Sequence, residues 1–259
     1  MKLRPSAKYG HLPRDVLPRE GPGRRRQKGS SRPPSAQWSE PLPFPARLSP
    51  TFGVAAMLLA FIAFAAPAAA VEAPKPTGAV DMAAVLKPGP LPELGLGDAK
   101  GVAMVEYGSL TCPHCATFDR EVMPKLKAAY IDTGKAHYIF REFSRNPLDQ
   151  AAFVLARCEG DDKALPTIDL LFAEQDKWAF VDKPLEPLID AMRPTGLTHD
   201  KAMACLKDDQ LAKKIEDIAK IAVDVVKLEG TPTFVIDGKV YDGELSMADL
   251  DEILKPLIK

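Results

Sequence analysis

The pattern of apolar and polar residues predicts a strand, a helix and a second strand within residues 101–146. The first apolar run, residues 102–107, contains one charged residue, Glu106. Apolar side chains then recur at helical spacing, at Phe118, Val122, Leu126 and Ala129. A second apolar run covers residues 136–141. Two strands joined by a helix are typical of a βαβ unit, in which both strands lie parallel in one sheet.

Residues that start and end helices lie where this pattern needs them. Thr111 can cap the helix, and Pro113 suits its first turn, where a backbone N–H is not needed. Pro124 predicts a kink inside the helix, and Gly134 ends the connection to the second strand. The segment between the first strand and the helix therefore lies at the carboxyl end of a strand, where α/β sheets place their chemistry.

Residues 147–228 show helical periodicity only. Breaks are expected at Gly160, near Pro184 and at residues 194–196. The last predicted helix of this segment has the clearest apolar stripe, formed by Leu211, Ile215, Ile218, Ala222 and Val225. The pattern predicts an all-helical insertion after the second strand.

The last part of the chain returns to a strand pattern. Residues 233–236 and 239–241 flank Asp237-Gly238, which is a strong signal for a hairpin turn. Ser246 then begins a final amphipathic helix. The order of elements predicts an α/β fold, with a mixed sheet, helices on both of its faces and an inserted all-helical domain.

Charge divides the chain near residue 50. Residues 1–50 hold 11 Lys and Arg against 3 Asp and Glu, and 10 of the 25 prolines, whereas the remainder holds 23 basic and 32 acidic residues. We expect residues 1–50 to be disordered, or to result from a translation start assigned too far upstream. A nucleic-acid-binding arm is the alternative. Residues 1–50 lack aromatic residues spaced for base stacking, so no nucleic-acid partner is expected.

Residues 51–70 have the features of an export signal. An uncharged apolar run, residues 52–66, follows a basic residue and leads into small residues, which predicts cleavage near Ala70. An uncleaved membrane anchor is the alternative, because the apolar run can be extended to about 20 residues. In both cases the chain is exported, and we expect it in the periplasm. The proline-rich residues 71–100 are expected to form a lead-in with at most one short helix, near residues 82–86.

Four cysteines follow the predicted signal: Cys112, Cys115, Cys158 and Cys205. In an oxidising compartment such cysteines are first interpreted as disulfides. Cys112 and Cys115 are separated only by Pro113 and His114, at a predicted helix start. Half of a zinc site is the alternative, but zinc needs four ligands, and the other two cysteines have no histidine at ligand spacing. We therefore expect a redox-active dithiol and neither a metal nor another cofactor.

The position of Cys112 at the helix start predicts an acidic thiol. Unpaired backbone N–H groups and the positive end of the helix dipole both stabilise a thiolate there. His114 adds a partial or full positive charge in the same turn. We expect the pKa of Cys112 to lie in the ~3.5 to 7.5 range of such cysteines, and Cys115, one turn further in, to be less acidic. A stable thiolate makes the corresponding disulfide a stronger oxidant.

Several features now occur together: the Cys112-Pro113-His114-Cys115 helix start, Glu106 six residues before it, a helical insertion, and Gly230-Thr231-Pro232-Thr233 at the opening of the third strand. In this combination the chain resembles the DsbA family of exported thiol:disulfide oxidoreductases. The resemblance covers roughly residues 90–259. It implies a thioredoxin-like sheet formed by residues 101–146 and 229–259, interrupted by the insertion of residues 147–228.

The resemblance also implies a role for each matched residue. Cys112 would be the nucleophile that forms a mixed disulfide, and Cys115 the thiol that resolves it. Glu106 would be a buried carboxylate that moves protons to and from Cys115. Pro232 would be a cis-proline beside the active site, and the Thr231 carbonyl would pair with an extended client chain. An ordinary strand-start proline and a locally satisfied carboxylate are the simpler alternatives.

Thr231 departs from the family pattern. DsbA enzymes often have valine before this proline, and threonine is similar to the exported disulfide isomerases DsbC and DsbG. A resemblance to those isomerases would imply a V-shaped dimer built on an added N-terminal domain. Residues 71–100 are too few and too rich in proline to form such a domain. Isomerase or reductase activity is therefore kept as the alternative to oxidase activity.

Cys158 and Cys205 lie in predicted helices of the insertion. A bridge between them would close a loop of about 48 residues and stabilise the fold by ~4 kcal/mol in the chain-entropy model. Some DsbA relatives are similar in having a second, non-catalytic disulfide in the helical domain. Two buried, unpaired thiols are the alternative.

These features predict a monomeric periplasmic dithiol oxidase. It would accept electrons from reduced, unfolded exported proteins through Cys112, and the resemblance implies a membrane reoxidant of the DsbB type. A thioredoxin-fold binding or holdase module, in which the dithiol is incidental, is the alternative from a different functional class.

Overall fold

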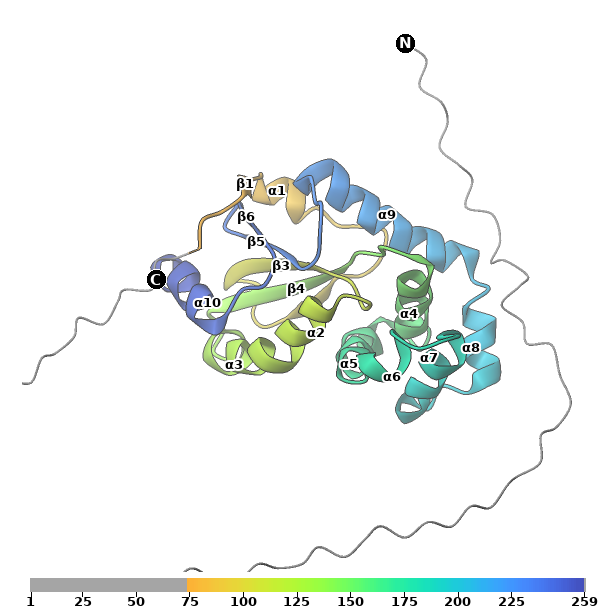
Figure 1. The fold of residues 1–259 in the computed structure, drawn as a ribbon. Coiled ribbons are helices and arrows are strands. Elements are labelled where there is room, and N and C mark those ends of the chain that lie inside the picture. The colour runs from red at the N-terminus through yellow and green to blue at the C-terminus, as the bar shows by residue number, and fades with distance from the viewer. Residues whose placement is uncertain (1–73, 259) are drawn as a thin grey trace, which may run out of the picture. The chain divides into compact units, whose positions relative to one another are not determined.

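A six-stranded mixed sheet forms the centre of the part of the chain that the computed structural model describes, residues 74–258 (Figure 1). The strands are β1 (Gly78–Ala79), β2 (Leu94–Leu96), β3 (Val102–Gly108), β4 (Ala136–Glu142), β5 (Thr233–Ile236) and β6 (Lys239–Asp242). Their order across the sheet is β1-β6-β5-β3-β4-β2. Only β3 and β4 pair in parallel, and the other four pairs are antiparallel. The predicted βαβ unit and the mixed sheet are confirmed.

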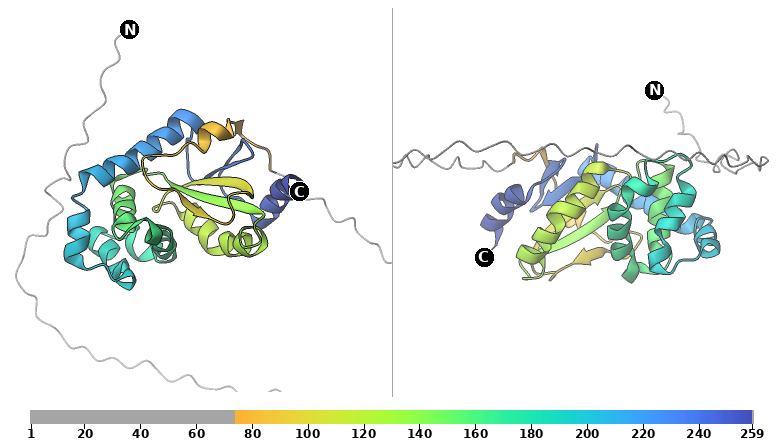
Figure 2. Two further views of the ribbon diagram at one scale, coloured as in Figure 1. Left: turned by 180° about the vertical axis from the view of Figure 1, so that it is seen from behind. Right: turned by 60° about the horizontal axis from the view of Figure 1, so that its bottom comes forward.

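Helices cover both faces of this sheet, because successive side chains of each strand point to opposite faces. On one face, Met104 and Phe234 pack with the helical segment that follows β3 and with α10 (Met247–Leu254). On the other face, Val105 and Val235 pack with α1 (Met82–Val85) and α9 (Asp209–Val226). The two views in Figure 2 show the same layers.

The segment before β3 differs from the expectation. α1 occupies the position of the predicted short helix, but the prediction of a lead-in without strands was wrong, because β1 pairs with β6 and β2 pairs with β4. These strands contain two and three residues. Each lies at one edge of the sheet and begins two residues after a proline. Strands this short have no alternation that a sequence pattern could show.

The predicted helix after β3 is continuous but changes its hydrogen-bonding pattern. It consists of α2 (Pro113–Thr117), the π-helical η2 (Phe118–Val122), α3 (Met123–Leu126) and the π-helical η3 (Lys127–Ile131). Pro124 lies in the first turn of α3, directly after a π-helical segment, where its missing N–H is accommodated. The prediction that Thr111 caps this helix was wrong. Cys112 is the N-cap residue, and the Thr111 hydroxyl instead accepts a hydrogen bond of 2.9 Å from the Asn146 side chain.

The predicted all-helical insertion is present between β4 and β5. Its elements are α4 (Pro147–Arg157), α5 (Asp161–Ala173), α6 (Gln175–Trp178), α7 (Leu185–Ala191), η4 (Arg193–Thr195), α8 (His199–Cys205) and α9. α9 belongs to both parts of the fold, since Ile215 packs in the core shared with the insertion while Ala222 and Val226 pack against the sheet. In Figure 1, α9 is the long blue helix that runs from the insertion to the sheet.

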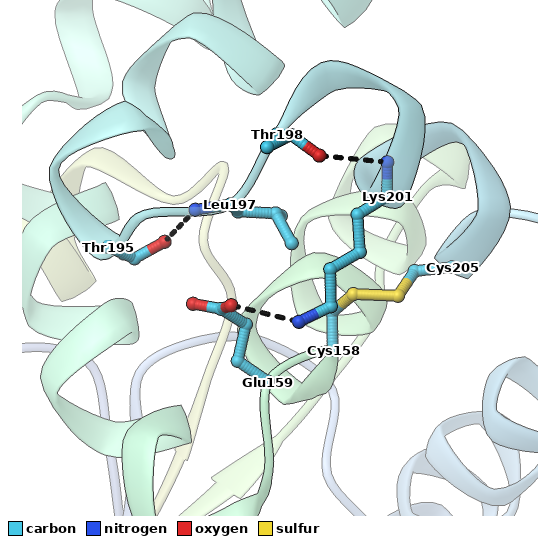
Figure 3. The surroundings of a disulfide bond; sticks show 7 residues. All are labelled: Cys158, Glu159, Thr195, Leu197, Thr198, Lys201 and Cys205. Carbon is cyan, nitrogen blue, oxygen red and sulfur yellow. Dashed lines mark hydrogen bonds and ion pairs between the residues drawn. A yellow bond between two sulfur atoms is a disulfide. The ribbon is translucent and has the colours of Figure 1, made fainter.

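A disulfide joins Cys158, which follows α4, to Cys205, the last residue of α8. Figure 3 shows this bond together with the ion pair between Lys201 and Glu159, whose N–O distance is 3.0 Å. The bridge spans a sequence separation of 47 residues and joins the C-terminal end of α4 to the C-terminal end of α8. The alternative of two unpaired thiols does not describe this structure.

The hairpin and the last helix form as their local sequences predict. Asp237 and Gly238 have φ values of 49° and 74°, so both central residues of the turn are in the left-handed region that a type I′ turn requires. Ser246 and Asp249 form a reciprocal capping box at the start of α10.

The predictions for residues 1–50 and for the export signal at residues 51–70 lie outside the described residues. Among residues 74–258, no helix has both the length and the apolar character required to cross a bilayer.

Candidate active site

The dithiol lies where β3 ends and α2 begins, at the carboxyl end of the two parallel strands. Cys112 has an extended backbone conformation, with φ −92° and ψ 118°, and the helix starts at the next residue. Cys112 and Cys115 are free thiols and both are buried, whereas Pro113 and His114 between them are exposed. The nucleophile predicted from the sequence therefore lies just beneath an exposed helix start.

The surroundings of the Cys112 sulfur stabilise its ionised form. Together they lower its pKa to about 5. The largest cause is a hydrogen bond from the Cys115 thiol; burial acts against it, and the Thr231 side chain and the backbone N–H groups of Cys115 and His114 add further stabilisation. The helix start thus contributes as the sequence predicts, but the neighbouring thiol contributes more.

Thr231 and Pro232 lie opposite the dithiol, directly before β5. The peptide bond between them is cis, and in its thiol form Cys112 Sγ donates a hydrogen bond of 3.2 Å to the Thr231 carbonyl. The Thr231 hydroxyl is buried and has no hydrogen-bond partner among the described residues. A neutral thiol is a weak acceptor for it, whereas a thiolate would be a strong one. Ionisation of Cys112 therefore gives this hydroxyl a partner.

Cys115 has the opposite electrostatic environment. Its pKa is raised well above the usual value, first by burial and then by the hydrogen bond that it donates to Cys112. Two thiols that are one helical turn apart thus differ strongly in acidity. At neutral pH the first is a thiolate and the second is a protonated thiol that can supply a hydrogen bond.

Glu106 lies on β3 behind the dithiol, with 1% of its surface exposed. Tyr138 donates a hydrogen bond of 2.8 Å to Glu106 Oε2. Burial raises the pKa of this carboxyl to about 8, against the effect of the tyrosine. Its charge in turn contributes to the raised pKa of Cys115. The two groups are therefore coupled, as a role in proton transfer requires.

His114 contacts a residue that the sequence did not indicate. Its Nδ1 lies 2.5 Å from Oε1 of Glu244, in the segment between β6 and α10, and both side chains are largely exposed. These residues are 130 positions apart, and Glu244 belongs to no motif. A carboxylate therefore lies beside the imidazole of the helix start.

We expect a Glu244→Gln variant to be more oxidising than the wild type, because removal of the negative charge that contacts His114, two residues after Cys112, favours the Cys112 thiolate. For an exposed pair the shift should be about 10 to 20 mV, measured by equilibration with glutathione at low salt. Glu252→Gln, the same change at an exposed position of α10, serves as the control. A potential equal to that of the wild type, or an equal shift in both variants, would contradict the expectation.

Metal binding has no support in the described residues. Between residues 74 and 258, no group of three or more histidine, cysteine, aspartate or glutamate side chains is arranged to hold a metal ion.

Comparison with known proteins relates this site to a family. The family model for thioredoxin matches residues 92–256. A putative protein-disulfide oxidoreductase from Rickettsia bellii is 38% identical over 146 residues, which are 56% of this chain and 56% of the relative. A probable disulfide bond formation protein D from Bacillus cereus is 27% identical over 176 residues, covering 64% of this chain and 76% of the relative. The matches span little more than half the length of the Rickettsia relatives.

Solved structures extend the comparison to the fold. The crystal structure of alpha-DsbA1 from Wolbachia pipientis has a TM-score of 0.60 and 30% sequence identity, and covers 65% of this chain and 92% of its own. A protein-disulfide isomerase from Novosphingobium aromaticivorans has a TM-score of 0.58 and 25% identity, with coverage of 64% and 98%. The arrangement of a thioredoxin-like sheet with a helical insertion is thus shared with DsbA-like proteins.

Proposed function

Because the chain belongs to the thioredoxin family and has a DsbA-like fold, we propose that it is a thiol:disulfide oxidoreductase that introduces disulfide bonds into exported proteins. In this reaction a client thiolate attacks the Cys112–Cys115 disulfide and forms a mixed disulfide with Cys112. A second client thiolate then attacks the client sulfur of that bond. The client leaves with a disulfide, and the two electrons remain on the Cys112–Cys115 dithiol.

One observation supports the direction of this reaction: the pKa of Cys112 is about 5. A free thiol has a pKa of about 8.5, so the folded protein favours the Cys112 thiolate between these two values. The reduced form therefore gains stability as the pH rises above 5, and the gain is complete near pH 8.5. At pH 7 it corresponds to about two decades in the exchange equilibrium, which makes the disulfide about 60 mV more oxidising.

The redox potential tests the proposal. We expect a value well above about −270 mV, the value for thioredoxin, when the protein is equilibrated with glutathione. A potential as low as that of thioredoxin would reject the oxidase function. Rapid repair of scrambled disulfides combined with slow oxidation of reduced clients would instead favour an isomerase, the function indicated by Thr231 and by the name of the Novosphingobium structure.

A Cys115→Ala variant should accumulate mixed disulfides with client proteins. Without Cys115, a bond between Cys112 and a client cannot be resolved from within the protein, so it should persist until a second thiol attacks it. The measurement is non-reducing electrophoresis of the variant expressed in a host with an oxidising periplasm, followed by identification of the trapped chains. A Cys112→Ala/Cys115→Ala variant is the control, and equal capture by both variants would favour a binding module.

The chemistry of the clients and the location complete the proposal. An oxidant of this strength acts on reduced, extended chains, which occur where exported proteins fold. Each turnover leaves the dithiol reduced, so a further oxidant is required. We propose a membrane protein of the DsbB type in this role and the periplasm as the location.

A further inference from the structure

The loop that carries the nucleophile is held by the helical insertion. Residues 109–112 connect β3 to α2, and the side chains of Ser109, Thr111 and Cys112 are buried. Their polar groups have few partners within the thioredoxin-like sheet. Most of their hydrogen bonds instead go to two side chains of the insertion, Asp149 and Gln175, and to Asn146, the N-cap residue of its first helix.

Gln175 bonds to both sides of the reactive cysteine. This first residue of α6 is 1% exposed. Its Nε2 donates a hydrogen bond of 2.7 Å to the Leu110 carbonyl and another of 3.0 Å to the Cys112 carbonyl. The first bond within α2, from Ala116 N–H to the same Cys112 carbonyl, has a length of 3.2 Å. The insertion therefore fixes the N-cap carbonyl at least as closely as the helix itself does.

Asp149 fixes the other half of the loop. Its buried carboxylate accepts hydrogen bonds of 2.8 Å from the Ser109 hydroxyl and from the Thr111 N–H, and one of 3.0 Å from the Arg145 N–H. All three donors are neutral, and no cation is needed to satisfy the group. A buried carboxylate with several donors holds those donors firmly, because leaving any of them unpaired is costly.

We propose that Gln175, supported by Asp149, is a positioning residue for the nucleophile: the insertion holds residues 109–112 so that the Cys112 sulfur faces the first N–H groups of α2. The physical basis is the geometry of a helix N-cap. An N-cap side chain meets the N–H groups of the next two or three residues only while its own backbone is extended, as it is at Cys112. A small rotation of the loop would move the sulfur away from these donors.

This inference rests on the proposed function, because it concerns the reactivity of the same thiol, but its test needs no client. Gln175→Met keeps the side-chain volume and removes both hydrogen bonds. We expect its Cys112 pKa, titrated by absorbance at 240 nm, to rise. The rate of alkylation at pH 5 should then fall about twofold to fivefold.

Two further variants separate positioning from stability. Trp178→Phe, in the same short helix, removes one buried hydrogen bond of 2.9 Å to the Leu171 carbonyl, which does not touch the loop. It should lower the melting temperature and leave the Cys112 pKa unchanged. Ser109→Ala removes one bond to Asp149 and should raise the Cys112 pKa by less than Gln175→Met does.

The outcomes distinguish the inference from the proposed function. An unchanged Cys112 pKa in both Gln175→Met and Ser109→Ala would overturn the inference, even if the wild-type protein is a strong oxidant. An equal rise of the pKa in Trp178→Phe would overturn it too, because it would show a general effect of destabilisation. An ordinary Cys112 pKa in the wild type would reject the oxidase function itself, and equal values in the variants would then reject both.

Discussion

Alkylation of the reduced protein at Cys112 should be nearly independent of pH between 6 and 9 and should fall about tenfold per pH unit below 5. The reason is that only the thiolate reacts and that the pKa of Cys112 is about 5. The rate at pH 3 should then be about one hundredth of the rate at pH 7. The measurement uses a limiting amount of iodoacetamide and mass spectrometry to assign the modified cysteine. Cys115 should not compete, because it is buried and protonated.

A pair of variants tests the largest cause of this pKa. The hydrogen bond from the Cys115 thiol is lost in Cys115→Ala, whereas the hydroxyl of Cys115→Ser can still donate to the Cys112 sulfur. The midpoint of the rate profile should therefore move to higher pH in the alanine variant and remain closer to the wild-type value in the serine variant. A wild-type profile that rises up to pH 8.5, as for a free thiol, would remove the basis of the oxidase proposal.

The features of the fold that could be predicted are those with local causes. The turn at Asp237-Gly238 and the cap at Ser246 each depend on residues within a few positions. The stripe of α9 depends on a period repeated over 18 residues. The position of the dithiol follows in the same way, because an apolar run and a helical stripe bracket it.

The features that could not be predicted depend on contacts between distant parts of the chain. β1 and β2 exist because edges of the sheet are available for pairing, not because of their own composition. The contact of Glu244 with His114 joins residues 130 positions apart, and the bonds of Gln175 to the loop span 65 and 63 positions. No periodicity or motif marks such residues, so only the folded chain brings them to the site.

The acidity of Cys112 combines both kinds of feature. Its position at a helix start was visible in the sequence, and the backbone N–H groups do contribute to its lowered pKa. The larger contribution of the Cys115 thiol depends on how one helical turn places two sulfur atoms, and the contribution of Thr231 depends on the approach of β5. The direction of the shift could therefore be predicted from the sequence, but its main cause could not.

A Glu106→Gln variant should be more stable than the wild type at alkaline pH and slightly less stable than it at acid pH, because the buried amide N–H group needs an acceptor at every pH. The pKa of Glu106 is about 8 in the folded protein and about 4.5 as a reference. Below pH 4.5 the carboxyl is protonated in both states, and its burial costs no charge. Between 4.5 and 8 only the folded protein retains the proton, so the wild type loses stability as the pH rises, by up to about 1.4 kcal/mol per unit. Above pH 8 the full cost of about 4 to 5 kcal/mol is reached.

Glutamine removes this cost, because its amide cannot ionise, and its carbonyl can still accept the hydrogen bond from Tyr138. The NH2 of the glutamine amide needs a buried acceptor, so the measured gain in unfolding free energy at pH 9 should be smaller than the full cost, about 2 to 4 kcal/mol. The measurement is urea unfolding of the oxidised proteins at pH 4 and pH 9, with Tyr138→Phe as a control that removes the hydrogen bond but not the charge. A pH-independent difference between Glu106→Gln and the wild type would show that Glu106 is not held as a buried, protonated acid. In that case the carboxyl could not exchange a proton with Cys115 near neutral pH.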